Sequence, residues 1–407
     1  MTPFARSPTP WALAALLLAP AALAQETPEV APPEIDDAAK GVVAISTEFP
    51  GGNVAVESNE PGRVGVAPDL RGDRPWFYWY FKATAERPGR VAFVFPEKVA
   101  GFNNGAIGFQ GPAIREGDGA WRWMGTETVY GPGFVYHFKT KGQTVRFAVT
   151  IPYTESDLSA FIQGHQSPHL QQSVLTRSRG GREVPLLRVG EPGPKKEAIL
   201  FTCRHHAVET MASFVLEGIV KEALSDSPAG IAFRERFVLY AVPFVDKDGV
   251  EAGDQGKNRR PFDHNRDYRE TSLYPEVQAI RELQATHGFR YAVDLHCPTL
   301  VMDVHQLAYF IGYQTIPPTN QANVAKWTAA IKEAKAEDAP FGPLNWLREK
   351  EEDKPTCSRW FGSQPGVVMS ATFEYPFAPK NAAANPADAR DYGAMMLRTF
   401  VETEFER

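Results

Sequence analysis

Two short polar motifs have the spacing needed to hold one metal ion. In the first, His206 and Glu209 stand three residues apart, directly after an apolar run. A turn that opens a helix there would bring an imidazole and a carboxylate to the same cation. In the second, His296 ends another apolar run, two residues after Asp294. Two histidines and a glutamate leave a fourth position for water, as in catalytic zinc sites, and the aspartate would orient the histidine beside it.

The immediate neighbours of these ligands leave two alternatives open. His205 precedes His206, so the first histidine ligand is chosen only by its spacing to the glutamate. Cys297 follows His296, and a thiolate is also a good zinc ligand. Because successive residues of a strand point to opposite faces, we expect only one of His296 and Cys297 to bind the metal.

Two further groups would complete a hydrolytic site. Asn265 and Arg266 lie in a loop rich in charged residues, where an arginine beside an asparagine can hold a carboxylate through paired hydrogen bonds. Taken alone, such a loop is more often a solvated surface segment. Glu374 ends an apolar run, and a buried carboxylate needs a partner. Beside a zinc site this glutamate would act as a general base.

The elements that carry these motifs alternate between strands and helices. The helix after the first motif has apolar residues at helical spacing between residues 211 and 219, and another helix is predicted from about residue 388. The pattern predicts an α/β fold with a mixed, mostly parallel sheet flanked by helices. Motifs that follow such strands meet at one edge of the sheet. Strands are predicted at residues 198–202, 237–242, 290–295 and 367–373.

Residues 41–150 have a different, β-rich pattern. Short aromatic runs separated by turns predict an antiparallel β-sandwich domain. One run covers residues 76–81, and residues 134–139 and 144–150 are expected to pair as a hairpin around Lys141 and Gly142. The aromatic side chains would fill a core or line a carbohydrate groove, and we expect the core because aromatic residues are mostly buried.

The N-terminal segment predicts export. Residues 1–24 combine Arg6, an apolar run and a small-residue cleavage site, which is typical of a signal peptide. The run is too short to favour a membrane anchor, and no other segment is apolar enough to span a bilayer. Residues 25–40 are rich in proline and acidic residues and predict a disordered leader. In an oxidising compartment Cys203 and Cys297 would form a disulfide, with buried reduced thiols as an equal alternative.

The composition excludes one large class of partner. The chain of 407 residues has 49 acidic and 43 basic side chains, which gives a formal charge of −6. A nucleic-acid-binding protein would be expected to be basic or to carry a basic stripe. The length allows two or three domains.

Taken together, the motifs resemble those of the zinc carboxypeptidases, or funnelins. In that family His-x-x-Glu, Asn-Arg, His and Glu follow one another in this order, and the chain has all four. The flanks resemble the cytosolic carboxypeptidase subgroup, whose Pro-Tyr-Thr-x-Ser-Asp-Leu segment is present at residues 152–158. The resemblance implies one zinc ion per chain and a β-sandwich before a catalytic domain at residues 151–407.

The resemblance also implies roles for arginine side chains. The family has an arginine that polarises the scissile carbonyl, for which Arg259 is the candidate and Arg260 the alternative. About fifteen residues before the general base, a residue often lies at the bottom of the side-chain pocket. That position is Arg359, which would favour an acidic C-terminal residue by charge pairing. The chain departs from the family at Ala207 and Val208, where proline and glycine are usual, and it has no clear match to the family's mobile tyrosine.

The sequence therefore predicts an exported zinc metallocarboxypeptidase. Its substrate would be the C-terminus of a peptide or protein, with a preference for acidic C-terminal residues as the finer hypothesis. Two alternatives remain open. One is an exported zinc amidohydrolase that acts on acylated amino acids or cell-wall peptides, and the other is a non-catalytic protein that binds a metal or a peptide.

Overall fold

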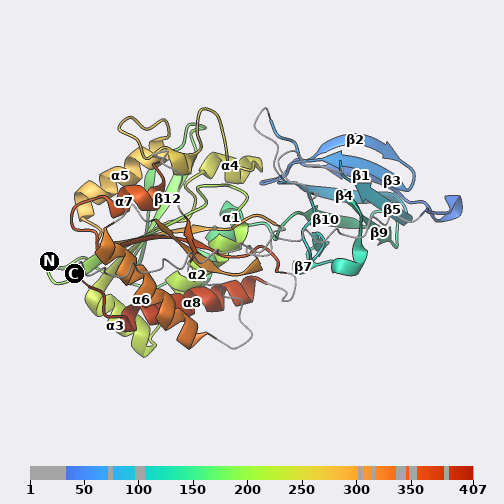
Figure 1. The fold of residues 1–407 in the computed structure, drawn as a ribbon. Coiled ribbons are helices and arrows are strands. Elements are labelled where there is room, and N and C mark those ends of the chain that lie inside the picture. Colours follow the sequence, from blue (N-terminus) through green and yellow to red (C-terminus); the bar gives the residue numbers. More distant parts are fainter. Residues whose placement is uncertain are drawn as a thin grey trace, which may run out of the picture.

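The chain forms two lobes, which a computed structural model shows side by side (Figure 1). The predicted signal peptide at residues 1–24 and most of the predicted leader lie outside the described residues, as does Trp76. The structure describes residues 34–71, 77–96, 106–300, 306–313, 317–335, 345–347, 355–379 and 385–406.

The N-terminal lobe is a sandwich of two five-stranded sheets, whose order is β1-β4-β10-β6-β7 in one and β2-β3-β5-β9-β8 in the other. All neighbours within these sheets are antiparallel except β3 and β5, which are parallel. The strands are β1 (Val42–Ser46), β2 (Ala55–Glu60), β3 (Arg63–Ala67), β4 (Tyr80–Arg87), β5 (Gly89–Val94), β6 (Ala113–Glu116), β7 (Arg122–Trp123), β8 (Val129–Tyr130), β9 (Gly133–Phe138) and β10 (Thr144–Ala148), with short 3₁₀ turns η1 (Asp37–Ala39) and η2 (Thr126–Thr128).

Aromatic side chains fill the space between these two sheets, as predicted. Phe81 and Phe147 come from one sheet, Phe93 and Phe134 from the other, and all four are buried. The Phe93 and Phe147 ring centroids are 5.1 Å apart, and those of Phe134 and Phe147 are 5.2 Å apart. Aromatic packing of this kind contributes beyond simple area burial.

The hairpin expected around Lys141 and Gly142 is wrong. The two strands form, but β9 pairs with β5 and β8, whereas β10 pairs with β4 and β6 in the opposite sheet. Both strands direct aromatic residues into the space between the sheets, where Phe134 of β9 and Phe147 of β10 are buried. The two strands do so from opposite sides, because β9 belongs to one sheet and β10 to the other. The short connection therefore crosses between the sheets.

The C-terminal lobe is built on an eight-stranded mixed sheet in the order β11-β12-β14-β13-β15-β18-β16-β17. Its centre, from β14 to β18, is parallel, as predicted. The strands are β11 (Leu170–Arg177), β12 (Glu183–Val189), β13 (Glu197–Cys203), β14 (Phe237–Val242), β15 (Tyr291–His296), β16 (Tyr309–Tyr313), β17 (Asn345–Leu347) and β18 (Met369–Glu374).

Helices cover both faces of this sheet. Figure 1 shows α5 and α7 on one face and α2, α3, α6 and α8 on the other. Within the described residues, no helix combines the length and the hydrophobicity needed to cross a bilayer. The helices are α1 (Glu155–Gly164), α2 (Thr210–Leu224), α3 (Pro228–Arg236), α4 (Lys247–Ala252), α5 (Pro275–His287), α6 (Pro318–Ala334), α7 (Cys357–Gly362) and α8 (Pro386–Glu402), with a 3₁₀ turn η3 (His264–Arg266).

The central strands alternate between two apolar cores, because both faces of the sheet are covered. Leu200 and Ala292 belong to the core under α5 and α7, whereas Ile199 and Val293 belong to the core under α2 and α8. Asp294 follows two residues after Ala292 on β15, so its side chain points to the α5 and α7 face. The polar residues at the ends of these strands therefore lie on the same face of the sheet as the apolar core under α5 and α7.

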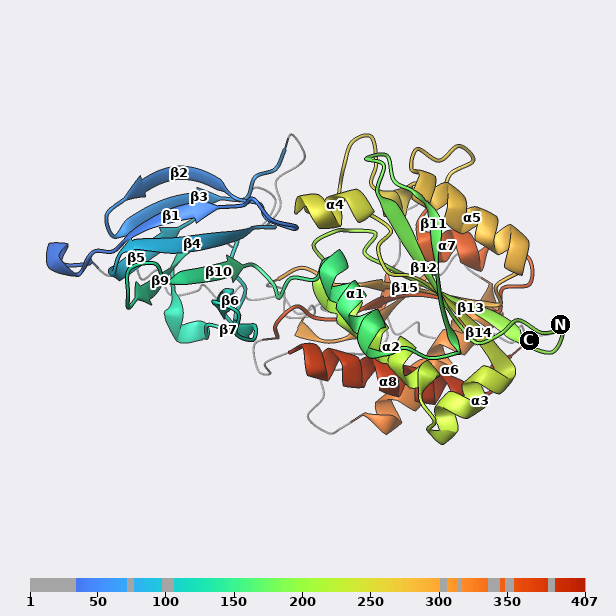
Figure 2. The same ribbon diagram turned by 180° about the vertical axis from the view of Figure 1, so that it is seen from behind.

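The two lobes meet at the segment that follows α4, which lies beside the sandwich (Figure 2). Gln255 Oε1 accepts hydrogen bonds from the backbone N–H groups of Phe77 and Tyr78, at 3.2 and 2.9 Å. Asn53 Nδ2 donates to Gly253 O at 2.6 Å. The link between β10 and α1 is the predicted Pro-Tyr-Thr segment, in which Thr154 and Asp157 form a capping box. The predicted boundary at residue 150 falls in this link and stays a prediction.

Helices α2 and α8 approach each other closely through two glycines. A Cβ atom on Gly218 would lie 1.9 Å from the backbone oxygen of Arg390, and one on Gly393 would lie 2.0 Å from that of Val215. Backbone atoms cannot retreat as a flexible side chain can. This close approach fixes α2, the helix that opens just after the first metal-binding motif.

We expect Gly218→Ala to destabilise the protein by about 1–3 kcal/mol or more, the cost of overpacking a well-packed contact. Gly164→Ala is the matched control, since it also lies in a helix and no atom lies within 4 Å of its added Cβ. Alanine there should be neutral or slightly stabilising. The measurement is urea unfolding of both variants, and equal midpoints would contradict the close-approach argument.

Candidate metal centre

The predicted ligands converge at the ends of two neighbouring strands. His206 Nδ1 lies 2.8 Å from Glu209 Oε1, and His296 Nδ1 lies 2.7 Å from Glu209 Oε2. All three side chains are about 2% exposed, and one donor atom of each lies within 4.8 Å of the others. Two imidazole nitrogens and a carboxylate on one point fit the donor set of a catalytic zinc site. The geometry also selects His206 over His205 and His296 over Cys297 for this group.

A strained turn presents the first motif. Arg204 follows β13 with a positive φ of 61°, which is uncommon for a residue other than glycine. Its buried guanidinium donates to the backbone oxygens of Tyr153 and Ala207 and to Ser213 Oγ. These contacts tie the turn to the link between the lobes and to α2. Sequence reasoning gave Arg204 no role, because the role depends on these contacts with other segments of the chain.

The predicted general base stands beside the ligands. Glu374 is the last residue of β18 and lies opposite His296 in the parallel register. Its side chain is 8% exposed, and none of the described residues forms a hydrogen bond with its Oε2. Burial, together with the nearby Glu209 carboxylate, raises the pKa of Glu374 to about 7, against the opposing charges of His296 and Lys257. A carboxyl group with a pKa near neutrality is suited to exchange protons in either direction.

Two buried aspartates face the outer nitrogens of the histidines. Asp294 Oδ2 lies 2.6 Å from His296 Nε2, as the sequence predicted. Asp263 Oδ2 lies 3.7 Å from His206 Nε2, and the charges of His206 and Arg266 hold the pKa of Asp263 well below its usual range although burial acts to raise it. Carboxylates in these positions fix the orientation of ligand rings and make them better donors.

The predicted carboxylate clamp also lies at this site. Asn265 and Arg266 are in η3, and Asn265 Nδ2 lies 3.3 Å from His296 Nε2. Arg266 Nη1 lies 2.9 Å from His206 Nε2 and donates to Asp263 Oδ2 at 2.9 Å. Asn265 is buried, whereas the Arg266 side chain is 28% exposed. The loop is therefore part of the site and is not a solvated surface segment.

The candidate polarising arginine is engaged in ion pairs. Arg259 Nη2 lies 2.7 Å from Asp246 Oδ2 and 3.1 Å from Asp254 Oδ2. Asp254 also pairs with Arg71 of the sandwich at 2.7 Å. Arg260 is exposed. Lys257, which sequence reasoning did not single out, is the cation of this segment that acts on Glu374.

The candidate pocket residue Arg359 lies in α7, two residues after Cys357. The backbone N–H of Cys357 donates to Asn265 Oδ1 at 3.0 Å, so α7 begins at the carboxylate clamp. Arg359 itself is half-buried.

The three cysteines are buried free thiols, so the expected disulfide between Cys203 and Cys297 is not formed. Cys203 pairs in register with Leu295, and Cys297 packs in the core under α2 and α8. Burial raises the pKa of the Cys203 thiol to about 12, which keeps it protonated. The alternative of buried reduced thiols is therefore the one that the structure contains.

A mixed sheet with a buried His₂Glu group at its strand ends is an arrangement that fits a zinc protein of the carboxypeptidase fold class. Residues 160–339 match the model of the zinc carboxypeptidase family. The matched segment includes His206, Glu209, Asn265, Arg266 and His296, and ends before Glu374.

Curated relatives match part of the chain. It is 30% identical to cytosolic carboxypeptidase 2 of Xenopus tropicalis over 159 residues, which are 36% of this chain and 16% of that protein. It is 25% identical to cytosolic carboxypeptidase 6 of Mus musculus over 190 residues, 43% of this chain and 35% of that protein. The chain thus spans well under half the length of these relatives.

Solved structures share the fold of both lobes. A metallo-carboxypeptidase from Burkholderia cenocepacia superimposes with a TM-score of 0.75 at 22% identity, over 89% of this chain and 98% of that one. A metallo-carboxypeptidase from Pseudomonas aeruginosa in complex with (2-guanidinoethylmercapto)succinic acid gives a TM-score of 0.75 at 19% identity, over 88% and 98% of the two chains.

A second buried acidic group lies behind the clamp. The His264 ring stacks on Tyr274 with centroids 3.6 Å apart, and His264 Nε2 lies 3.9 Å from Glu276 Oε2. Burial raises the pKa of Glu276 to about 8, helped by the Asp246 and Asp248 carboxylates and opposed by Arg179.

We expect Glu276 to make the folded state less stable as the pH rises. The folded protein keeps this proton up to a pKa of about 8, whereas the unfolded chain loses it near 4.5. The stabilisation is therefore complete below pH 4.5 and disappears between pH 4.5 and 8. Glu276→Gln should flatten this part of the pH dependence of unfolding. A slope equal to that of the wild type would contradict the assignment.

Proposed function

We propose that the protein is a zinc-dependent metallocarboxypeptidase that removes the C-terminal residue of peptides or proteins. The observation that carries the proposal is the placement of Glu374 beside the His206, Glu209 and His296 group, with its pKa near neutrality. A binding protein would have no need to keep a buried carboxyl oxygen that none of the described residues hydrogen-bonds at this position, because such burial costs free energy.

The side chains divide the reaction between them. A zinc ion held by His206, Glu209 and His296 would supply an activated water and polarise the scissile carbonyl. Glu374 would accept the proton of the attacking water through its carboxylate oxygen and pass it to the nitrogen of the leaving amine. Asn265 and Arg266 would hold the terminal carboxylate of the substrate, which limits cleavage to the last peptide bond.

A cation from residues 257–259 would stabilise the negative charge that develops on the carbonyl oxygen. Arg259 remains the candidate from the family resemblance. Its pairs with Asp246 and Asp254 favour a role in holding the loop. Lys257 is the second candidate, since its charge acts on Glu374. Both would act from a segment that the sandwich lobe contacts.

Two finer proposals concern the preferred C-terminal residue of the substrate and the location of the protein. Arg359 would favour acidic C-terminal residues, because α7 begins at the clamp residue Asn265 and carries this arginine within its first turn. The signal-peptide pattern of residues 1–24 supports export to the periplasm or the exterior. The amidohydrolase alternative uses the same zinc ligands, so only substrates separate the two functions.

The first test is cleavage of a peptide ladder, read by mass spectrometry. We expect the zinc-loaded wild type to remove one C-terminal residue at a time and to leave a C-terminally amidated peptide uncut. Glu374→Gln should bind zinc normally and lose at least about 100-fold in kcat, the usual contribution of a general base. Cleavage of acylated amino acids without cleavage of peptides would select the amidohydrolase, and full activity of Glu374→Gln would overturn the role of the base.

The second test concerns specificity. Peptides that differ only in a C-terminal Glu, Lys or Phe should be cleaved with the highest kcat/KM for Glu. Arg359→Gln should lower kcat/KM for the Glu peptide by about 10-fold or more while sparing the Phe peptide, since a lost charge pair costs more than about 1.4 kcal/mol when it is desolvated. Arg122→Gln, on the sandwich surface, is the control for a lost positive charge. A uniform loss on all peptides would contradict a pocket role.

A further inference from the structure

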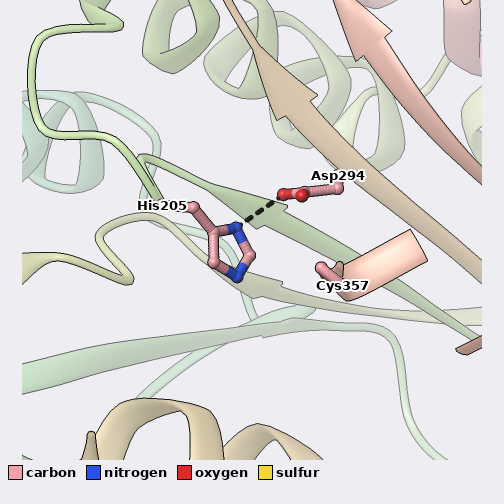
Figure 3. A group of neighbouring side chains, drawn as sticks. All are labelled: His205, Asp294 and Cys357. Atoms are coloured by element: carbon pink, nitrogen blue, oxygen red, sulfur yellow. Dashed lines mark hydrogen bonds and ion pairs between the residues drawn. The ribbon is translucent and has the colours of Figure 1, made fainter. Parts of the chain in front are cut away.

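A buried polar chain continues from the metal centre into the core under α5 and α7. It consists of Asp294, His205, Tyr268 and Thr202, all at most 2% exposed, with Cys357 at its border. Figure 3 shows His205 and Asp294 joined by a hydrogen bond with Cys357 beside them. None of these residues is a proposed ligand of the metal or of the substrate, and the proposed mechanism does not use His205, Tyr268 or Thr202.

Three donors converge on the carboxylate of Asp294. Oδ1 accepts from Thr202 Oγ1 at 2.8 Å and lies 2.7 Å from His205 Nδ1, while Oδ2 lies 2.6 Å from His296 Nε2. Thr202 sits opposite Asp294 in the register of β13 and β15. Three donors hold the buried carboxylate of Asp294 in a single orientation. The carboxylate can therefore align the ring of His296.

The contacts of His205 settle which of its nitrogens carries the proton. A carboxylate only accepts hydrogen bonds, so His205 Nδ1 must donate to Asp294. His205 Nε2 is then an acceptor, and the Tyr268 hydroxyl, 2.9 Å away, donates to it. The order of donation is Tyr268 to His205 to Asp294, and each group holds the next in a fixed orientation.

The same chain reaches the carboxylate clamp. Tyr268 follows Arg266 by two residues in the clamp loop, and Thr202 Oγ1 lies 3.6 Å from Cys357 Sγ. The backbone of Cys357 holds Asn265 Oδ1. The loop that would bind the substrate carboxylate and the strand end that carries His296 are therefore held by one set of buried contacts.

We propose that His205 is a positioning residue for the metal centre, which acts through Asp294 to orient the ligand His296. This inference rests on the proposed metal site and extends it to a residue that does not bind the metal. It also assigns a role to His205, because the spacing to Glu209 selected only its neighbour His206 as a ligand.

The alternative use of these groups is a second metal site, since donor atoms of His205, Asp294 and Cys357 lie within 4.8 Å of one another. Both nitrogens of His205 already have hydrogen-bond partners, and Asp294 Oδ1 already has two. A second cation would have to displace these contacts, which favours the hydrogen-bonded chain.

The test measures zinc affinity by competition with a chelating dye, so it needs no peptide substrate. We expect His205→Leu to bind zinc about 10- to 100-fold more weakly than the wild type, the usual effect of removing the support of a metal ligand. His205→Asn should stay close to the wild type, because the asparagine nitrogen can replace Nδ1 as the donor to Asp294. Tyr268→Phe, which removes one hydroxyl group, should give an intermediate loss.

Two controls separate this role from general destabilisation. Val277→Ala removes methyl groups from the same apolar core on α5 and should lower the melting temperature without changing zinc affinity. Wild-type zinc affinity in a folded His205→Leu variant would overturn the proposal. So would two zinc ions per wild-type chain with the loss of one in Cys357→Ser, which would make these residues a metal site. Weakened zinc binding in His205→Leu in a protein that cleaves no peptide would overturn the proposed function alone.

Discussion

The structure depends on the pairing of carboxylates that are buried at the ends of parallel strands. Glu209, Asp263 and Asp294 are each at most 2% exposed, and each lies against one or both of the histidines His206 and His296. Removing a charge from water is costly unless a partner and further hydrogen bonds compensate it. The two histidines meet this requirement together with Arg266, which pairs with Asp263, and with Thr202 and His205, which contact Asp294, so the site and the fold around it are stabilised by the same contacts.

Glu374 is the exception among the carboxyl groups of the site. It lies on the same edge of the sheet, yet one of its carboxyl oxygens has no hydrogen-bond partner among the described residues, and its pKa is raised to about 7. The neighbouring acids have strong partners that keep them ionised. The surroundings of these carboxyl groups thus separate three that stay ionised, Glu209, Asp263 and Asp294, from Glu374, whose pKa lies near neutrality.

The candidate ligands and the candidate base could be selected from the sequence because each lies at or directly after the end of a strand whose apolar pattern can be read locally. The candidate clamp lies in a loop after α4 and was selected by its residue types, and all of these roles stay predictions. The sequence could not predict the contacts that depend on residues far apart in the chain. The roles of Arg204 and Tyr268 come from partners in other elements, and the expected hairpin failed because sheet membership is decided by the shared interior. The expected disulfide also failed: Cys203 and Cys297 share one apolar core, but Cys203 lies opposite Leu295, two residues before Cys297, and both thiols are free. The domain limits and the export signal remain predictions from the sequence.

Charge distribution limits how an acidic substrate could be recognised. The chain carries a net charge of −6, and two arginines of the site and its flanking segment have acidic partners of their own: Arg266 pairs with Asp263, and Arg259 with Asp246 and Asp254. Long-range attraction of an acidic peptide is therefore weak, and salt screens charges beyond about 8–10 Å. A preference for a C-terminal acidic residue has to arise from a charge within the side-chain pocket, where water is excluded and a single cation acts at short range. The net acidity of the chain and an acidic preference are thus compatible, because they act over different distances.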